Sequence, residues 1–367
     1  MNILHVTKSY APTIGGIETV VKQLAEGMAV RGHKISVLCC AEKNSTDEIQ
    51  GVTVYRKKTL FNVGSAPVSP GCFFGLRNLI KEQDVIHFHV PNPIGELAYC
   101  FSRRNKPPKV VCTYHLDPVR PKIFVKFYKK LLHRFLNLCD VVCPTSPNYM
   151  ASSDVLSAFK EKCRPIPLGI ETPRFTNVNE VRKREAESLV KHLKHPRILF
   201  CGRFSYYKGL PFLVEAVSKI QECSLILVGD GEKKGELEHQ VKTLGMQNRV
   251  VFLGHLPDEL YPAIYHAADL FVLPSVYRSE AFGIVGLEAM AAGLPLVTTE
   301  LGGGTSYYNV DGETGYVVEA GCSESLARAI RGILSAPEKA KEMSIAAKQR
   351  VQEFDLAVLV EAYLKQL

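Results

Sequence analysis

Short apolar runs without polar alternation recur along this chain, and longer segments of helical periodicity separate them. The first two runs are 2–7 and 34–40. Between them, Val20, Leu24 and Met28 recur at helical spacing. Continuous apolar runs are typical of parallel strands that are covered on both faces. The alternation therefore predicts an α/β fold with doubly wound sheets.

The alternation is interrupted once and then restarts. The interruption is 164–173, where three prolines and a glycine cannot continue a helix or a central strand. We therefore predict two similar domains, 1–168 and 169–353. The predicted strands are 2–7, 34–40, 85–90, 110–114 and 141–144 in the first domain, and 197–201, 224–228, 249–253, 270–273 and 296–299 in the second. Residues 338–367 are expected to be helical, without a further strand.

The composition is that of a folded protein, because 46% of the 367 residues are hydrophobic and 22% are charged. It excludes a largely disordered or collagenous chain. The longest apolar stretches, such as 284–296, are too short to span a membrane. The N-terminus lacks the pattern of a secretory signal. With these features we expect the eleven cysteines to be reduced thiols in a cytoplasmic protein.

The charge is divided unevenly between the two halves. Residues 1–170 hold 23 Lys and Arg against 12 Asp and Glu, whereas residues 171–367 hold 22 against 25. A basic half suggests a negatively charged partner, for which nucleic acid, an anionic membrane and a phosphorylated substrate are the candidates. No nucleic-acid-binding motif accompanies the basic excess, so we expect no nucleic-acid partner.

Much of the basic excess lies in 120–136, a segment of helical periodicity. Its cations are interleaved with apolar residues, as in Lys126, Phe127, Lys129 and Lys130. Such a helix is typical of a membrane-surface element, and Arg103, Arg104, Lys106 and Lys109 would add to it. A helix packed on the sheet with its lysines in water explains the pattern equally well. A peripheral position on the inner face of the plasma membrane is one of the two expectations.

Three motifs follow predicted strands. Gly15-Gly16 lies between the first strand and the first helix, where the backbone can approach a phosphate or a sugar. Arg203 and Lys208 follow the strand at 197–201 and can together hold a diphosphate. Either motif by itself also fits a tight turn or solvated cations.

The third motif runs from Glu280 to Glu288. Gly283 lets the chain turn into a helix whose free N–H groups, at Ile284 and Val285, can hold a phosphate. Glu288 lies about a turn further on, where its carboxylate can accept both hydroxyls of a ribose. Glu280 precedes the helix and is expected to project into a cleft between the domains.

Together these motifs resemble family 4 of the retaining glycosyltransferases, which have the GT-B fold. The resemblance covers nearly the whole chain, and the run 275–295 with Gly302-Gly303 and 311–315 is its most specific part. The run Gly304–Asn309 differs from that of many members and resembles a bacterial subgroup of mannosyltransferases that acts in O-antigen and lipopolysaccharide synthesis. The resemblance implies two Rossmann-like domains facing a cleft, the second binding the donor, and a last helix, 354–367, that returns to the acceptor-side first domain.

The resemblance also implies roles for individual residues. The residues expected to act in catalysis are Glu280, His115, Arg203 and Lys208. The residues expected to bind the donor are Gly15, Gly16, Arg203, Lys208, Phe282, Gly283, Ile284, Val285 and Glu288. Arg203 and Lys208 would stabilise the leaving diphosphate in place of a metal, so neither a metal nor a cofactor is expected. His87 and His89 alternate on one strand as metal ligands can, but we interpret them as packed or cleft-lining.

The expected reaction is transfer of a hexose with retention, for which mannose from GDP-mannose is the best candidate. The expected acceptor is a glycan or a saccharide linked to polyprenyl diphosphate. A sugar-nucleotide epimerase, a phosphorylase of the same fold and a non-catalytic nucleotide-sugar-binding module stay open. An epimerase would act without an acceptor, and a phosphorylase would need free phosphate.

Overall fold

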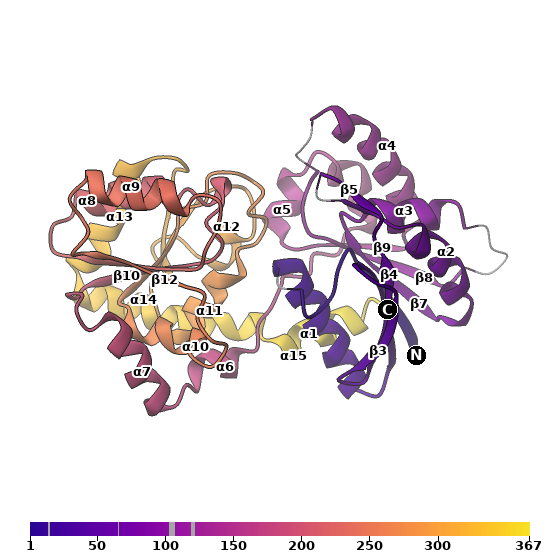
Figure 1. Ribbon diagram of the computed structural model, residues 1–367, viewed down its shortest axis with the longest axis horizontal. Coiled ribbons are helices and arrows are strands. Elements are labelled where there is room, and N and C mark those ends of the chain that lie inside the picture. Colours follow the sequence, from indigo (N-terminus) through magenta and orange to yellow (C-terminus); the bar gives the residue numbers. More distant parts are fainter. Residues whose placement is uncertain (14, 65, 103–106, 119–121) are drawn as a thin grey trace. The chain divides into compact units, whose positions relative to one another are not determined.

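The computed structural model describes residues 1–13, 15–64, 66–102, 107–118 and 122–367, with the backbone alone at 122–126. The chain divides into two compact units (Figure 1). Unit 1 comprises Met1–Gly169 and Leu356–Leu367, and unit 2 comprises Ile170–Asp355. Both are doubly wound α/β units, so the predicted fold class is confirmed.

The sheet of unit 1 has the order β3-β4-β2-β1-β7-β8-β9. All five predicted strands are present and parallel, namely β1 (Asn2–Val6), β2 (Lys34–Ala41), β7 (Val85–Val90), β8 (Lys109–Tyr114) and β9 (Val141–Pro144). Their side chains are almost all buried, as continuous apolar runs require. Two further strands at the edge, β3 (Ser45–Ile49) and β4 (Val52–Lys58), and a hairpin of β5 (Phe61–Val63) and β6 (Ala66–Val68) were not predicted. These strands alternate between buried and half-exposed or lie largely exposed, so no apolar run marks them.

The helices of unit 1 cover this sheet. They are α1 (Gly16–Val30), α2 (Pro70–Leu79), α3 (Pro93–Cys100), α4 (Lys122–Leu138), α5 (Pro147–Ser152) and α15 (Leu356–Leu364), with 3-10 turns at Ile80–Glu82 and Leu156–Lys162. The predicted apolar face of α1 is confirmed, because Val20, Leu24 and Met28 are fully buried.

The last helix, α15, packs on unit 1, as the resemblance implied. It contacts α1, and Arg31 Nε lies 2.7 Å from Glu361 Oε1. Tyr363 is fully buried, and the Thr113 hydroxyl of β8 donates to its hydroxyl over 2.8 Å. The chain therefore crosses from unit 2 back to unit 1 after Asp355.

The sheet of unit 2 has the order β12-β11-β10-β13-β14-β15, with all pairs parallel. Its strands are β10 (Arg197–Cys201), β11 (Ser224–Val228), β12 (Val250–Gly254), β13 (Leu270–Leu273), β14 (Leu296–Thr299) and β15 (Gly315–Val318). The first five were predicted, β12 one residue early. β15, which was missed, lies at the sheet edge, and its apolar run at 316–318 is short and only partly buried.

Helices cover both faces of this sheet, with α8, α9 and α13 on one face and α10, α11 and α14 on the other (Figure 1). The helices of unit 2 are α6 (Thr172–Thr176), α7 (Glu180–Val190), α8 (Leu210–Ser218), α9 (Lys234–Thr243), α10 (Tyr261–Ile264), α11 (Ile284–Ala292), α12 (Thr305–Tyr308), α13 (Ser323–Leu334) and α14 (Pro337–Arg350), with 3-10 turns at Tyr206–Lys208, Tyr265–Ala267 and Val351–Phe354. Residues 338–367 contain no strand, as predicted.

All eleven cysteines are free thiols, and nine of them are buried. This agrees with the reduced state expected from the sequence. Among the described residues, no helix is long and apolar enough to cross a membrane.

Candidate functional site

In unit 2, β10 lies beside β13, and the strand order runs outward from this pair in both directions. Ligands of open α/β sheets bind outside the carboxyl ends of the strands at such a switch point. The loop after β10 carries Lys208 and Gly209, and the loop after β13 begins with Pro274. Gly209 has a φ of +66°, and a Cβ there would lie 2.1 Å from the Pro274 carbonyl oxygen. The glycine therefore allows the two loops to meet.

This contact brings two predicted residues together. Lys208 Nζ lies 2.5 Å from Glu280 Oε2, and both side chains are less than a tenth exposed. The Ser275 hydroxyl donates to the same oxygen over 2.8 Å. Burial by itself lowers the pKa of Lys208, but Glu280, Tyr207 and Glu288 together more than offset it, so the pKa is raised and the ammonium keeps its charge. Glu280 thus lies in a buried ion pair with Lys208. The expectation that it projects into a cleft between the domains stays a prediction.

Arg203 has a different environment from Lys208. Its side chain is 75% exposed, and its Nε lies 3.7 Å from Glu232 Oε2. The Glu232 carboxylate also accepts from the backbone N–H of Tyr206, over 3.4 Å. A solvated guanidinium near a carboxylate can reorient toward an anion at low cost.

The turn before α11 is built as predicted. Gly283 has a φ of +76° and precedes the first helical residues, Ile284 and Val285, whose N–H groups have no partner within the helix. Phe282 is buried, and the Tyr308 hydroxyl donates to the Gly283 carbonyl over 2.9 Å. The helix N-terminus is therefore held in place and can receive a phosphate.

Glu288 lies on α11 with two partners that the sequence did not indicate. Its Oε2 accepts from the Tyr261 hydroxyl over 2.7 Å and from the Tyr265 hydroxyl over 2.6 Å. Burial raises the pKa of Glu288, and the two hydroxyls oppose that rise. The tyrosines hold the carboxylate through one oxygen, so Oε1 can serve as acceptor for a ligand.

The remaining predicted residues lie in unit 1. Gly15 precedes α1 and Gly16 begins it, and a Cβ at Gly16 would meet open space among the described residues. The Ser9 hydroxyl donates to Glu18 Oε1 over 2.7 Å, which joins the first turn of α1 to the loop after β1. The Glu18 carboxylate lies against Gly15, so an acidic group already occupies part of this helix N-terminus. The role predicted for the two glycines stays a prediction.

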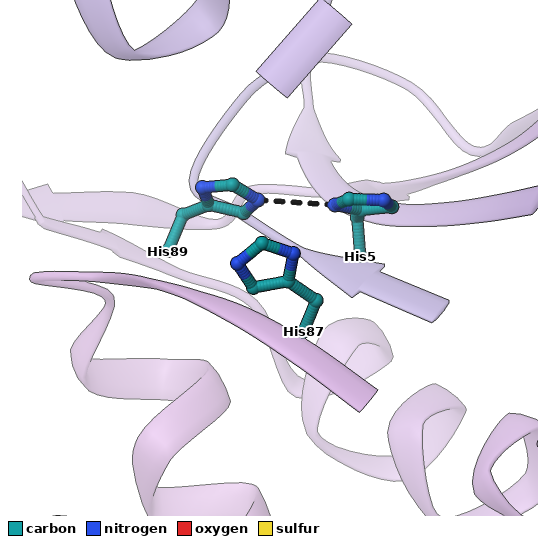
Figure 2. A group of neighbouring side chains, drawn as sticks. All are labelled: His5, His87 and His89. Carbon is teal, nitrogen blue, oxygen red and sulfur yellow. Dashed lines mark hydrogen bonds between the residues drawn. The ribbon is translucent and has the colours of Figure 1, made fainter. Parts of the chain in front are cut away.

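His115 follows β8 directly and is 3% exposed. Its ring lies edge to edge with that of His89 in a nearly parallel plane, and the His89 ring is arranged in the same way against His5. Figure 2 shows His5, His87 and His89 together, from β1 and β7. All are buried, so the interpretation of His87 and His89 as packed is confirmed. The pairing of β1 with β7 places His5 opposite His87, which inspection of each strand by itself does not show.

A cavity of about 950 Å³ lies in unit 1 at the carboxyl ends of β1, β2 and β4. Lys8, Glu18 and Arg56 line it, and so do Phe61 of the β5–β6 hairpin and Leu60, which precedes it. Phe61 is 57% exposed. A mixture of charged groups and an aromatic surface suits a saccharide that carries a polar or anionic group. Two of its lining residues, Thr13 and Glu18, flank the Gly15-Gly16 motif, whereas no motif indicated the side formed by the β5–β6 hairpin.

The basic segment 120–136 lies largely in α4. Arg120 and the cluster at Arg103, Arg104 and Lys106 lie outside the described residues, and of Lys122 and Lys126 only the backbone is described. From 127 onward, Leu132, Phe135 and Leu136 are buried, whereas Lys129, Lys130 and Arg134 are exposed. Phe127 is 70% exposed on the basic side. This part of the helix thus packs on the sheet and also presents cations and an aromatic ring to solvent.

Comparison with known proteins identifies the family. Residues 14–174 match the family described as Glycosyltransferase Family 4, and residues 181–350 match Glycosyl transferases group 1. The D-rhamnosyltransferase WbpZ of Pseudomonas aeruginosa is 35% identical over 360 residues, which cover 96% of this chain and 92% of that protein. The O-antigen chain mannosyltransferase C of Escherichia coli is 32% identical over 368 residues, 99% of this chain and 97% of that protein.

A solved structure shares the fold. Anabaena Alr3699/HepE, crystallised in complex with UDP, has a TM-score of 0.81 and 22% identity, covering 100% of this chain and 99% of that chain. Its likeness supports the two Rossmann-like units of the GT-B fold. Since two relatives above 30% identity span nearly the whole chain, this protein belongs to the family 4, group 1 glycosyltransferases and is a glycosyltransferase with the GT-B fold.

Proposed function

We propose that this glycosyltransferase transfers mannose from GDP-mannose, with retention, to a saccharide acceptor in O-antigen or lipopolysaccharide synthesis. The proposed donor site is based on the ion pair between Lys208 and Glu280 at the carboxyl ends of β10 and β13. The similarity to an O-antigen chain mannosyltransferase supports the sugar and the pathway.

In the proposed site, Arg203 and Lys208 hold the donor diphosphate. An ammonium has three donors, so Lys208 can keep Glu280 and also donate to a phosphate oxygen. Arg203 can approach by rotating its exposed side chain. These two cations and the N-terminus of α11 stabilise the charge that develops on the leaving diphosphate. We therefore propose that the reaction needs neither a metal nor a cofactor.

Three further residues are proposed to orient the donor. Glu288 accepts hydrogen bonds from the ribose hydroxyls through the oxygen that the tyrosines leave available. Glu280 orients the hydroxyls of the transferred sugar, and His115 lies beside that sugar. Because burial lowers the pKa of His115 to about 3, its ring acts as a neutral hydrogen-bonding group rather than as a cation.

The proposed transfer is a same-face substitution at the anomeric carbon. The bond from the acceptor oxygen to this carbon forms as the bond to the diphosphate oxygen breaks on the same face. The proton of the acceptor hydroxyl passes to the leaving phosphate. No carboxylate has been assigned as a nucleophile, so a covalent sugar intermediate is not part of the proposal.

The cavity of unit 1 is the proposed acceptor site. Its lining cations, Lys8, Lys43 and Arg56, outnumber its carboxylates, Glu18 and Glu42, which favours an anionic group. Phe61 offers an aromatic face for a sugar or an isoprenoid chain. A saccharide linked to polyprenyl diphosphate fits these groups. Nucleic acid is not a proposed partner. The exposed cations of α4 support a peripheral position on an anionic inner membrane face, where such an acceptor resides.

D-Rhamnose is a second candidate for the transferred sugar, because the relative at 35% identity is a D-rhamnosyltransferase. D-Rhamnose is D-mannose without its 6-hydroxyl. The two donors therefore share the groups that Arg203, Lys208 and Glu288 are proposed to bind, and only a direct comparison separates them.

A binding experiment tests the donor site. Thermal unfolding is measured for the full chain with GDP, UDP and ADP and with their sugars, for the native protein, Arg203→Ala and Lys242→Ala. We expect GDP at 100 times its dissociation constant to stabilise the native protein by about 2.7 kcal/mol. Arg203→Ala should lose much of this stabilisation without unfolding, because Arg203 is exposed. Lys242, exposed on α9, is the matched control.

Transfer is then measured with GDP-mannose and GDP-rhamnose on lipid-linked saccharides. Stabilisation by UDP but not GDP would contradict the proposed nucleotide. Equal stabilisation of the native protein and Arg203→Ala would contradict the role of Arg203. Transfer that stops after removal of divalent metal and resumes when it is added back would contradict metal independence.

A further inference from the structure

His115 is one end of a chain of three hydrogen-bonded histidines, which we call the histidine relay: His5, His89 and His115. His115 Nε2 lies 3.1 Å from His89 Nδ1. His89 Nε2 in turn lies 3.1 Å from His5 Nδ1, the contact drawn in Figure 2. Both nitrogens of the middle ring are thus engaged by the two outer rings.

Each ring of the histidine relay carries one proton. Burial lowers the pKa of His5 and of His115 to about 3, and that of His89 well below its usual value. A neutral imidazole has one N–H and one bare nitrogen, so it can donate one hydrogen bond and accept one. Lys8, which interacts with His115, further favours the neutral ring.

The geometry makes the tautomers of the three rings depend on one another. If His5 donates to His89, then His89 must donate to His115, and every ring carries its proton on Nδ1. If His115 donates to His89, every ring carries its proton on Nε2. In either direction the three rings share one tautomer, and the Nδ1 of His115 is either a donor or an acceptor throughout.

We propose that His5 and His89 are positioning residues that hold His115 in a single tautomer and ring orientation, so that its Nδ1 offers one fixed hydrogen-bonding role to the transferred sugar. The hydrogen bond between His115 and the transferred sugar rests on the proposed function. The tautomer itself depends only on the hydrogen bonds of unit 1. A partner that fixes the tautomer of a functional histidine is a general device of protein sites.

His87 allows a different interpretation of the same cluster, as a metal site. The nitrogens of His5, His87 and His89 that could bind a metal all lie within 4.8 Å of one another. His5 Nε2 and His87 Nδ1 are buried and have no hydrogen-bond partner among the described residues. His89, however, has no free nitrogen, so a third metal bond would break the histidine relay. The hydrogen bonds present therefore favour the relay.

His87 also serves as the control for His89. It lies two residues away on β7 with its side chain on the same face, and it is equally buried. Its Nε2 lies 2.7 Å from the Thr113 hydroxyl, which donates to Tyr363, so it belongs to a separate set of hydrogen bonds. Replacement of the buried His87 imidazole disturbs packing as much as replacement of the His89 imidazole. It leaves the hydrogen bonds of the histidine relay in place.

The test uses the full chain labelled with ¹⁵N in its histidine rings, as native protein, His89→Phe and His87→Phe. Ring ¹⁵N shifts distinguish a nitrogen that carries a proton from a bare one. We expect His5, His89 and His115 to share one tautomer in the native protein, and His5 and His115 to keep it in His87→Phe. In His89→Phe, His115 should populate both tautomers. Different tautomers among the three native rings, or a His115 unchanged in His89→Phe, would overturn the proposal.

The turnover number kcat is then measured for the same variants, each at the same interval below its own unfolding temperature. His89→Phe should lower kcat by up to about 100-fold, the cost of a misplaced group, while the stabilisation by GDP stays unchanged. His87→Phe should retain kcat. Failure of GDP to bind the native protein would contradict the proposed function and leave the tautomer result standing. If equimolar Zn²⁺ stabilises the native protein and shifts all three ring signals of Figure 2, the cluster is a metal site and the relay is wrong.

Discussion

At the scale of single residues, the proposed donor site contains charged groups that are already paired within the protein. Lys208 and Glu280 lie in one buried ion pair, and Glu288 is held by two tyrosine hydroxyls. A buried charge whose partner is removed is strongly destabilising. Substitution of these residues therefore changes stability as well as donor binding, whereas Arg203 can be replaced without that complication.

We predict that Lys208→Met lowers the free energy of unfolding by about 3–5 kcal/mol, because it leaves the Glu280 carboxylate buried without its cation. The double variant Lys208→Met/Glu280→Gln should recover most of this loss. Urea unfolding followed by far-UV circular dichroism measures both. Lys234→Met is the control, because Lys234 pairs with Asp230 at the surface and should change stability by less than about 1 kcal/mol. A Lys208→Met variant as stable as the native protein would contradict the buried pair.

At the scale of elements, the prediction succeeded for buried strands and failed at sheet edges. A strand such as β10 is apolar at nearly every position because both of its faces are covered. β4 lies beside an edge and alternates between apolar and polar residues, and β15 lies at an edge with only a short, partly buried run at 316–318. In the β5–β6 hairpin β5 is exposed and β6 is half-buried, so neither the hairpin nor the cavity beside it can be predicted from periodicity.

The helix α4 carries the prediction about membranes. If its exposed face binds anionic lipid, Lys129→Glu/Lys130→Glu should weaken binding to vesicles of phosphatidylglycerol and phosphatidylethanolamine. Loss of the two lysines should cost about 2 kcal/mol, or roughly 30-fold in affinity, at low salt. Flotation at increasing salt measures the effect. The matched control, Lys242→Glu/Lys341→Glu, changes the same charge on exposed positions of unit 2. Equal flotation of both double variants, or none for the native protein, would count against a membrane role.

At the scale of the whole molecule, unit 1 is assembled from two stretches of chain that 186 residues of unit 2 separate. The charge follows the same division, since the excess of cations lies in residues 1–170. The basic character therefore belongs to the unit that holds the proposed acceptor cavity, whereas unit 2, the proposed donor unit, has no such excess of cations.

Truncation after Asp355 tests this assembly. It removes α15 and exposes the sites of three buried side chains, those of Leu359, Val360 and Tyr363. Each contributes about 1.5–3 kcal/mol by burial, so unit 1 should be destabilised by several kcal/mol. Hydrogen exchange read by mass spectrometry should then quicken in α1 and β8 and stay unchanged in unit 2. Removal of residues 366–367 alone is the control. Unaltered exchange in unit 1 would contradict the packing of α15.

The sequence by itself determined the two doubly wound units, the break between them, the turn at Gly283 and the family. These depend on local features, such as apolar runs, prolines, glycines and the spacing of motif residues along the chain. The sequence also predicted that Lys208 and Glu280 lie at the same site, because both follow strands whose carboxyl ends lie at one edge of a sheet.

Only the tertiary structure decided which of these side chains are paired and which are free. The tyrosine partners of Glu288 lie 23 and 27 residues away, and His5 and His89 are 84 residues apart. Their contacts come from strand order and register, which residue spacing does not encode. Since a buried group must find its hydrogen-bond partner in the fold, the chemistry of Lys208, Glu288 and His115 is defined by these distant contacts.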